Sequence, residues 1–455
     1  MTTDHPVQTL TFYPFAYALL DEEVASHCWY CLRETCTTNQ LRKCSTCKVA
    51  LYCDKKCQNL GWSDHVAECK AFLNNKDIVG DCSPTILPVE VRMLARIVWR
   101  YKCILKDNKF VSSEGFSLNR SSKRSIMEIC DHAEDIRRDS YAIDKFESIY
   151  QKLTLCYDKK HICDKETVFQ LHCRNFINRH SISDLDYMKE IAKGLFLDLC
   201  AYNHSCAPNA VYTCSSFVAT LRSLSKDVDL NNISTTFYTY IDLLLSKQLR
   251  RKLLSETWYF KCYCTRCSDV NDHLLTSIRC FECNHAIMIF DEKDSLKTEA
   301  TCNCGHKITE EVINRALILM RSLDTIVSNL PDDNDPKDKL QFLTDLAAKH
   351  KHLLHGSNIY YVKIFQSIIG LLDPVRDSSD LLKYHEQSID CMKLCFPNRH
   401  PALAYHFMNM GIFSRRLNDD RRAENYLKQA YDMLKFSLGE DHSMTKKCVD
   451  WLEKR

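Results

Sequence analysis

The stretch that decides the fold is AYNHSCAPNA, residues 201–210, in which an amide, an imidazole, a hydroxyl and a thiol follow one another from Asn203 to Cys206. These polar side chains stand in an otherwise apolar neighbourhood, where unpaired polar groups are costly to bury. Three roles are open for Cys206: a catalytic nucleophile, a metal ligand, or a small buried residue. The cysteines elsewhere in the chain decide between them.

The composition describes a large folded protein with reduced cysteines. The chain has 455 residues, 45% hydrophobic and 26% charged, with a formal net charge of +2. This length predicts about two to four domains, and the small net charge gives no strong indication of direct DNA binding. The 27 cysteines lie in short metal-type spacings and no basic leader precedes them, so we expect zinc in a reducing compartment. No segment reaches the ~18 apolar residues of a membrane span, so we expect no membrane partner.

The first cysteine-rich zone runs from Cys28 to Cys69 and offers eight ligands, enough for two tetrahedral zinc sites. Zinc prefers thiolate and imidazole ligands, and a CxxC turn places two sulfurs about 2.3 Å from one ion. The order of the pairs predicts interleaved sites and leaves Cys36 over. The predicted sets are Cys28, Cys31, Cys53 and Cys57 on one ion, and Cys44, Cys47, His65 and Cys69 on the other.

A second motif, CxCxxC at Cys262, Cys264 and Cys267, is one ligand short of a closed tetrahedral site. Structural zinc takes four protein ligands, and Cys206 is the natural fourth because it would staple its loop to this trio. The nucleophile role is weaker, since no Cys-His-Asn order accompanies Cys206. We therefore predict a third zinc site at these four thiols.

Two further cysteine pairs follow the trio and could close a fourth zinc site. This prediction rests on spacing alone, and reduced cysteines on a hairpin are the alternative. The pairs are Cys280 with Cys283 and Cys302 with Cys304, and His285 and His306 lie close to them in the sequence.

From about Glu310 onward the apolar residues recur at helical spacing, which predicts an all-helical segment. Within it, residues 370–400 and 411–442 look like two copies of one unit, each a glycine, an amphipathic helix pair and a histidine-containing end. This period of 41 to 42 residues resembles a long tetratricopeptide repeat. Such repeats form binding platforms, and ordinary amphipathic helices without repeat geometry are the alternative.

These motifs together are typical of one family. The zone 28–69, with Tyr52-Cys53 and Trp62-x-x-His65, closely resembles a MYND zinc finger. NHSCxPN at 203–209, the segment Phe237-Tyr-Thr-Tyr-Ile-Asp242 and the CxCxxC trio resemble a SET domain with its post-SET zinc loop. With the repeat-like helices behind them, this order resembles the SMYD family of protein lysine methyltransferases over nearly the whole chain.

The resemblance implies an α+β fold, in which a SET-type β fold is interrupted by a MYND zinc finger and a helical insert and is followed by a post-SET zinc loop and an all-α TPR-like domain. The implied segments are 1–27 (residual N-terminal SET segment), 28–69 (MYND finger), 70–175 (helical linker), 176–255 (SET core), 256–308 (post-SET and zinc-rich segment) and 309–455 (TPR-like helices).

The resemblance also implies a cofactor site for S-adenosyl-L-methionine. Asn203 and His204 would hold the amino-acid and adenine ends of this cofactor, and Phe260 would pack against the adenine. His132, in the linking segment, would contact the cofactor tail.

Tyr240 matches the family tyrosine at the methyl-transfer channel, where its phenol oxygen would orient the methyl group for attack by a neutral lysine amine. Tyr238 lies on the same strand face by the period of two and is the main rival. Tyr240 is preferred because the family spacing puts the tyrosine two residues before the aspartate. Without the flanking motifs both would read as ordinary strand aromatics.

The sequence departs from the family pattern in two places. The family strand with a GxG turn, which approaches the cofactor, belongs ahead of the segment around Pro14, and no GxG occurs in this chain. The Gly-Glu pair before the tyrosine strand is replaced by Lys226–Ile233. We therefore expect either an enzyme with an alternative or truncated N-terminal start, or a catalytically impaired adaptor that keeps the scaffold. A zinc hydrolase is disfavoured because every predicted site is closed by four protein ligands.

The resemblance implies partners and a location as well. The substrates would be histones or other proteins with a target lysine, and the finger would bind proline-containing peptides or partner proteins. We expect a monomer found in the cytoplasm and the nucleus.

Overall fold

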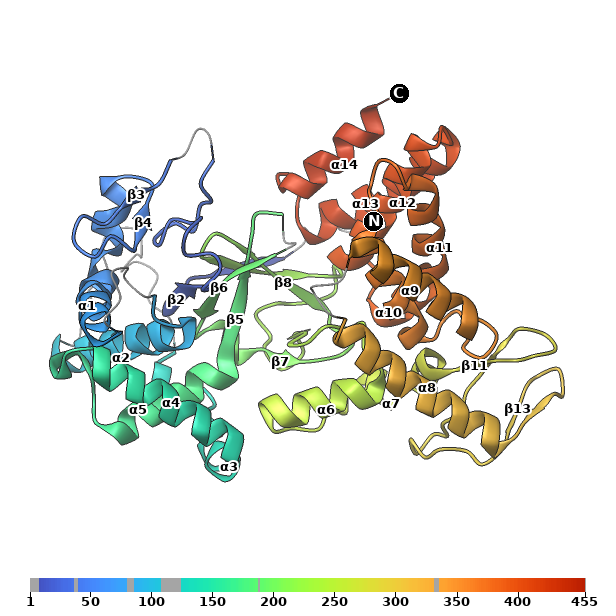
Figure 1. Cartoon of the computed structure of the whole chain (residues 1–455), viewed down its shortest axis with the longest axis horizontal. Coiled ribbons are helices and arrows are strands. Elements are labelled where there is room, and N and C mark those ends of the chain that lie inside the picture. Colours follow the sequence, from blue (N-terminus) through green and yellow to red (C-terminus); the bar gives the residue numbers. More distant parts are fainter. Residues whose placement is uncertain are drawn as a thin grey trace.

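The computed structural model describes residues 8–454, apart from 37–39, 80–85, 108–123, 187–188 and 331–334. Every segment predicted above except 256–308 therefore includes residues outside this description. Figure 1 shows the finger and the first helices on one side, small sheets in the middle, and the C-terminal helices on the other side. This mixture of helices and small sheets confirms the predicted α+β class.

Helices carry most of the described structure. None of the helices in the described ranges combines the length and apolarity that crossing a bilayer requires. The α-helices are α1 (Lys55–Val79), α2 (Val89–Asp107), α3 (Ala133–Arg138), α4 (Ser140–Cys156), α5 (Lys165–Asn178), α6 (Lys247–Trp258), α7 (Thr265–Ser268), α8 (Glu310–Ser328), α9 (Pro336–His350), α10 (Ile359–Leu371), α11 (Ser378–Cys395), α12 (Pro401–Arg416), α13 (Asp420–Ser437) and α14 (Ser443–Glu453).

The strands are short and form separate small sheets. They are β1 (Thr9–Phe12), β2 (Ala16–Leu19), β3 (Arg42–Lys43), β4 (Leu51–Tyr52), β5 (Arg179–Ser183), β6 (Glu190–Leu195), β7 (Asn203–His204), β8 (Ala210–Ser215), β9 (Val218–Ser223), β10 (Phe237–Tyr238), β11 (Ile278–Arg279), β12 (Ala286–Ile287), β13 (Ala300–Thr301) and β14 (Lys307–Ile308).

Two three-stranded antiparallel sheets form the centre of the molecule, with the orders β1-β9-β8 and β2-β6-β5. Each takes one strand from the first 20 residues: Leu10 pairs with Leu221, and Tyr17 with Gly194. The N-terminal segment is thus an integral part of both sheets. A third, two-residue pairing joins β7 to β10 in parallel and lies at the functional site.

Three buried arginines of α2, spaced four residues apart, fasten the finger to this β-structure. Their guanidinium groups donate to backbone carbonyls of alternate residues along β2 and its approach. The spacings match, because four helical residues advance about 6.0 Å and two strand residues about 6.6 Å. The pairs are Arg92 with Leu19, Arg96 with Tyr17 and Arg100 with Phe15.

Two of these arginines also meet carboxylates of the finger helix α1, whereas Arg92 pairs with Asp21. Arg96 forms a two-pronged pair with Glu68, at 2.6 and 3.0 Å, and Arg100 Nε donates to Asp64 at 2.7 Å. Removing one member of such a buried pair leaves an uncompensated charge, so each pair constrains where α1 can lie. One helix therefore positions both the finger and a sheet strand.

The boundaries of the two predicted sequence units do not coincide with the boundaries of the C-terminal helices. Gly370 lies near the end of α10 and Gly411 in the middle of α12, so residues 370–400 contain one complete helix rather than a pair. The equivalent units are α10 with α11 and α12 with α13. His400 and His442 are equivalent: each caps the next helix, accepting a hydrogen bond at 3.2 Å from the backbone N–H two residues on.

The two equivalent glycines have different surroundings, which gives a test of the packing. A Cβ on Gly411 would lie 2.6 Å from Cγ of Leu427 on α13, whereas a Cβ on Gly370 would meet nothing within 4 Å. We expect Gly411→Ala to lower the free energy of unfolding by about 1–3 kcal/mol through overpacking. The matched control Gly370→Ala should leave it unchanged or raise it by up to about 1 kcal/mol. Equal effects of both substitutions in denaturant unfolding would contradict this packing.

Candidate functional site

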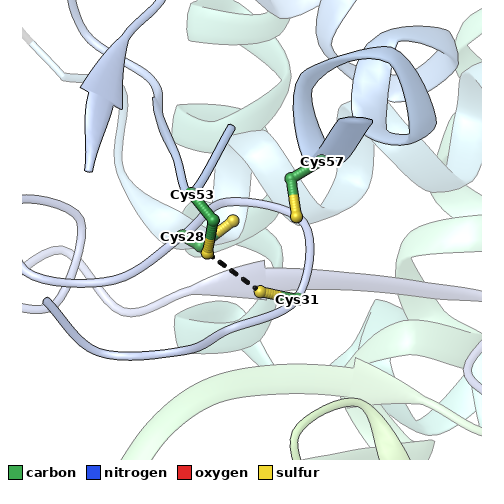
Figure 2. A group of neighbouring side chains, drawn as sticks. All are labelled: Cys28, Cys31, Cys53 and Cys57. Carbon is green, nitrogen blue, oxygen red and sulfur yellow. Dashed lines mark hydrogen bonds between the residues drawn. The ribbon is translucent and has the colours of Figure 1, made fainter. Parts of the chain in front are cut away.

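The structure brings each of the four predicted ligand sets together. Within each set, the ligand atoms lie within 4.8 Å of one another. In the first set, Sγ of Cys31 and Sγ of Cys53 are 3.5 Å apart, and Figure 2 shows the four sulfurs turned toward a common centre. A tetrahedron with zinc–sulfur bonds of about 2.3 Å has edges of about 3.8 Å, so this spacing fits zinc.

The second set of the finger is held by a buried charge network. His65 Nε2 lies 3.5 Å from Sγ of Cys47 and is the ring nitrogen that faces the thiols. Its Nδ1 is 3.6 Å from Oε2 of the fully buried Glu68, which favours a proton at Nδ1 and leaves Nε2 as the ligand. Burial alone would raise the pKa of Glu68, but Arg96 and His65 hold it at about 2.

Cys206 lies among the sulfurs of the trio. Its Sγ is 4.0 Å from Sγ of Cys262 and 3.6 Å from Sγ of Cys267, and its backbone N–H donates to Cys264 Sγ at 3.3 Å. The four thiols close a tetrahedral site, which leaves Cys206 no free position as a nucleophile. This arrangement, called here the Cys206 clasp, joins two segments that are more than 50 residues apart in the sequence.

Buried arginines surround the Cys206 clasp. Arg250 donates to Cys267 Sγ at 3.7 Å and to Asp272 at 2.7 Å, and so neutralises part of the thiolate charge. Arg266 donates to the same Asp272 and to the backbone oxygens of Leu243 and Cys395. Because Cys395 ends α11, the clasp is tied directly to the C-terminal helices.

The loop before the clasp is bound to the tyrosine segment by hydrogen bonds. Ser205 N–H donates to the Tyr238 carbonyl at 3.0 Å, and Tyr240 N–H donates to His204 Nδ1 at 3.0 Å. The Tyr240 hydroxyl donates to the Tyr202 carbonyl at 2.7 Å. The clasp therefore fixes the position of both tyrosines.

The predicted strand 237–242 is shorter than expected. It ends at Tyr238, because the Tyr240 N–H bonds to the His204 side chain instead of a strand backbone. Tyr238 and Tyr240 nevertheless line the same cavity, and their ring centroids are 5.1 Å apart. Burial raises the pKa of both hydroxyls above the usual tyrosine value, so both remain protonated donors near neutral pH.

The cavity next to these tyrosines has a volume of about 460 Å³, within the range of small-molecule sites. Residues of β5 and β10, the ends of α5 and α6, and the turn before α3 contribute to its lining. No carboxylate belongs to the lining as far as the described residues go. The predicted residues that line it are His132, Asn203, Tyr240 and Phe260.

His204 is placed differently from the other predicted cofactor residues. Its ring is buried outside the lining, with Nδ1 accepting from Tyr240 and Nε2 at 3.2 Å from Cys206 Sγ. Both ring nitrogens are used within the protein, which leaves only the backbone of His204 to meet a ligand. His132 has a left-handed backbone (φ 47°), and its Nδ1 lies 2.9 Å from Asp135.

Comparisons with known proteins found a family model and relatives similar to this chain. The family model of the MYND finger matches residues 28–69. The chain is 23% identical to N-lysine methyltransferase SMYD2-B of Xenopus laevis over 94% of this chain and 89% of the relative. It is 24% identical to histone-lysine N-methyltransferase SMYD3 of Homo sapiens, over 97% and 90% respectively. It is also 24% identical to histone-lysine N-methyltransferase ASHR1 of Arabidopsis thaliana, over 88% and 82%.

These similarities support the SMYD family for this chain. They agree with the family predicted from the sequence, and the matched finger and the grouped cysteines support zinc as a cofactor of this protein. In each set, ligand number, ligand type and spacing fit tetrahedral zinc.

Sequence reasoning missed several residues of the cavity. His180, the second residue of β5, forms a hydrogen bond of 2.7 Å between its Nε2 and the Tyr238 hydroxyl. Burial lowers the pKa of His180 to about 4, so its ring is neutral at neutral pH. Trp258, the last residue of α6, donates from Nε1 to the Ile177 carbonyl at 2.8 Å and faces Tyr240. Asn178 also lines the cavity. Isolated residues at element ends carry no spacing signal, so only the fold reveals them.

The charge network at His65 gives a test of the finger. We expect Glu68→Gln to weaken zinc binding roughly 10- to 100-fold, because the substitution removes the carboxylate beside the histidine ligand and leaves Arg96 unpaired. The measurement is the rate of zinc release to a chromogenic chelator. Glu166→Gln, which changes an exposed carboxylate paired with Arg137, is the matched control. Equal release rates for both variants would contradict this role of Glu68.

Proposed function

We propose that this protein transfers a methyl group from S-adenosyl-L-methionine to the side-chain amine of lysine in a protein substrate. The observation that carries the proposal is the cavity in which Asn203, Tyr240, Phe260 and His132 meet beside the Cys206 clasp. The relatives' names support it, since they are called lysine methyltransferases. When bound, S-adenosyl-L-methionine supplies a methyl group made electrophilic by its sulfonium.

The cofactor end of the cavity is assigned to Asn203, Phe260 and His132, with the backbone of His204. Phe260 follows Tyr259, whose left-handed backbone (φ 57°) turns the chain as α6 ends. A flat aromatic ring at this position offers a stacking surface for an adenine. Asn203 presents an amide with both donors and acceptors, which suits the amino-acid end of the cofactor.

The target-lysine end is assigned to Tyr240, with Tyr238, His180 and Trp258 around it. The Tyr240 hydroxyl donates its proton to the Tyr202 carbonyl, so the lone pairs of its oxygen remain to orient a positively polarised methyl group. Aromatic walls bury the lysine stem and disfavour its charged form. Because no carboxylate lines the described part of the cavity, the amine must lose its proton before or during entry.

The proposal includes the partners expected from the family. Protein substrates would reach the cavity from the side of the C-terminal helices, whose TPR-like pairing we retain as part of the proposal. The finger would bind proline-containing peptides, and Trp62 on α1 is 42% exposed at its surface. We propose a monomer that acts in the cytoplasm and the nucleus.

Cofactor binding and turnover test the proposal together. We expect the zinc-loaded chain to bind S-adenosyl-L-methionine with micromolar affinity by calorimetry. We expect Tyr240→Phe to lower the rate of methyl transfer roughly 100-fold, because it removes a preorganised oxygen, while the chain stays folded and cofactor affinity changes little. Tyr141→Phe, at an exposed tyrosine of α4, is the matched control.

Absence of binding by the folded, zinc-loaded chain would contradict the proposal. The chain would then be a noncatalytic adaptor that binds partners through its finger and its C-terminal helices. Equal methyl-transfer rates for Tyr240→Phe and Tyr141→Phe would instead contradict the assignment of Tyr240.

A further inference from the structure

One cysteine cluster lies apart from the region matched by the finger model, from the Cys206 clasp and from the cavity. Its four members are Cys280, Cys283, Cys302 and Cys304, and their sulfurs lie within 4.8 Å of one another. They sit on two hairpins, β11–β12 and β13–β14, that project beside α8 in Figure 1. We call residues 278–308 the ribbon.

The two hairpins of the ribbon carry similar turns that differ by one residue in length. In each, the N–H of the first cysteine donates to the carbonyl of the histidine that follows the turn, at 2.9 Å for Cys280 and 2.8 Å for Cys302. In each, the residue after the second cysteine has a left-handed backbone: Asn284 with φ 63° and Gly305 with φ 90°. Each turn contributes two of the four sulfurs, which all lie close to one another.

The sulfur spacing is that of a metal site. Sγ of Cys280 lies 3.6 Å from Cys304, and Sγ of Cys283 lies 3.4 Å from Cys302. These distances are far above the ~2.05 Å of a disulfide and close to the ~3.8 Å edge of a zinc–thiolate tetrahedron. The first set of the finger has the same spacing, at 3.5 Å.

Little else in the ribbon could hold its two hairpins together. Each strand has only two residues, and an isolated two-stranded hairpin is marginally stable in water. Apart from the cysteines, its buried apolar side chains are Ile278, Ile287, Ile289, Ala300 and Ile308. At one edge, Arg279 N–H donates to the Leu353 carbonyl at 2.9 Å, which ties the first hairpin to the segment after α9.

The loop between the hairpins reaches α6. At its tip, Asp294 accepts from Lys247 at 2.8 Å and from Arg251 at 2.5 Å, one turn apart on α6. Nε2 of the buried His273 is 3.0 Å from the same carboxylate. Phe290, at the start of the loop, stacks on the His273 ring with centroids 5.3 Å apart.

We propose that the four ribbon thiolates bind a zinc ion and that this ion holds the loop so that Asp294 clamps α6. The ion joins the hairpins before and after the loop, so it fixes both ends of the segment that carries Asp294. α6 ends at Trp258, and Trp258 and Phe260 line the cavity. The ribbon is thus a metal-dependent support for one wall of the cavity.

Zinc content tests the metal site. Purified wild-type chain should hold about four zinc ions per molecule by inductively coupled plasma mass spectrometry, and Cys283→Ser/Cys304→Ser should hold about three. These two cysteines are the more exposed members of the set, so their substitution disturbs the core least. Cys36→Ser, at an exposed cysteine outside the four sets, is the matched control and should keep four. Equal zinc content in wild type and the double variant would overturn the proposal.

Hydrogen exchange tests the clamp. In the double variant, amide exchange should accelerate at least tenfold in residues 288–297 and in α6. Asp294→Asn should accelerate exchange in α6 while keeping four zinc ions, and Glu299→Gln, an exposed ribbon carboxylate paired with Lys307, should do neither. Unchanged exchange in α6 for both the double variant and Asp294→Asn would overturn the clamp. Neither readout needs a methyl donor, so failure here is distinct from failure of the proposed activity.

Discussion

The structure depends on the Cys206 clasp. Four sulfurs at tetrahedral spacing join the NHSC loop to the CxCxxC segment. Two residues before Cys206, His204 accepts the Tyr240 N–H, and the Tyr240 hydroxyl in turn reaches back to Tyr202. On the other side, Arg266 carries the constraint to the end of α11. A zinc ion here stabilises a cavity wall and a domain contact at once, because the ligands come from segments that no regular sheet connects.

Buried ion pairs hold the finger in place, as the Cys206 clasp holds the NHSC loop. The arginines of α2 satisfy strand carbonyls on one side and finger carboxylates on the other, so zinc sites and β-structure are positioned by one helix. Glu68 belongs to both systems, since it pairs with Arg96 and stands beside the zinc-type ligand His65. The described sheets have only two or three strands each, so metal sites and paired charges help to hold the segments of the chain together.

The sequence predicted what depends on local spacing. Metal-type pairs such as Cys28 and Cys31 can be recognised from their spacing in the sequence. Because the CxCxxC trio lacks one ligand of a tetrahedral zinc site, the sequence also indicated Cys206 as the fourth ligand. The buried contacts of Arg92, Arg96 and Arg100 could not be predicted, because charged residues at helical spacing usually mark a solvated face. His180 and Trp258 reach the cavity only through the folded chain. The predicted repeat units began one helix too late, because Gly370 and Gly411 lie inside α10 and α12 and do not mark the helix boundaries.

The most direct test of the Cys206 clasp is a crystal structure with diffraction data collected on both sides of the zinc absorption edge. We expect an anomalous peak about 2.3 Å from the sulfurs of Cys206, Cys262, Cys264 and Cys267, with no water ligand. A peak bound by the trio without Cys206, or no zinc at this position, would contradict the central claim that the clasp shapes the cavity.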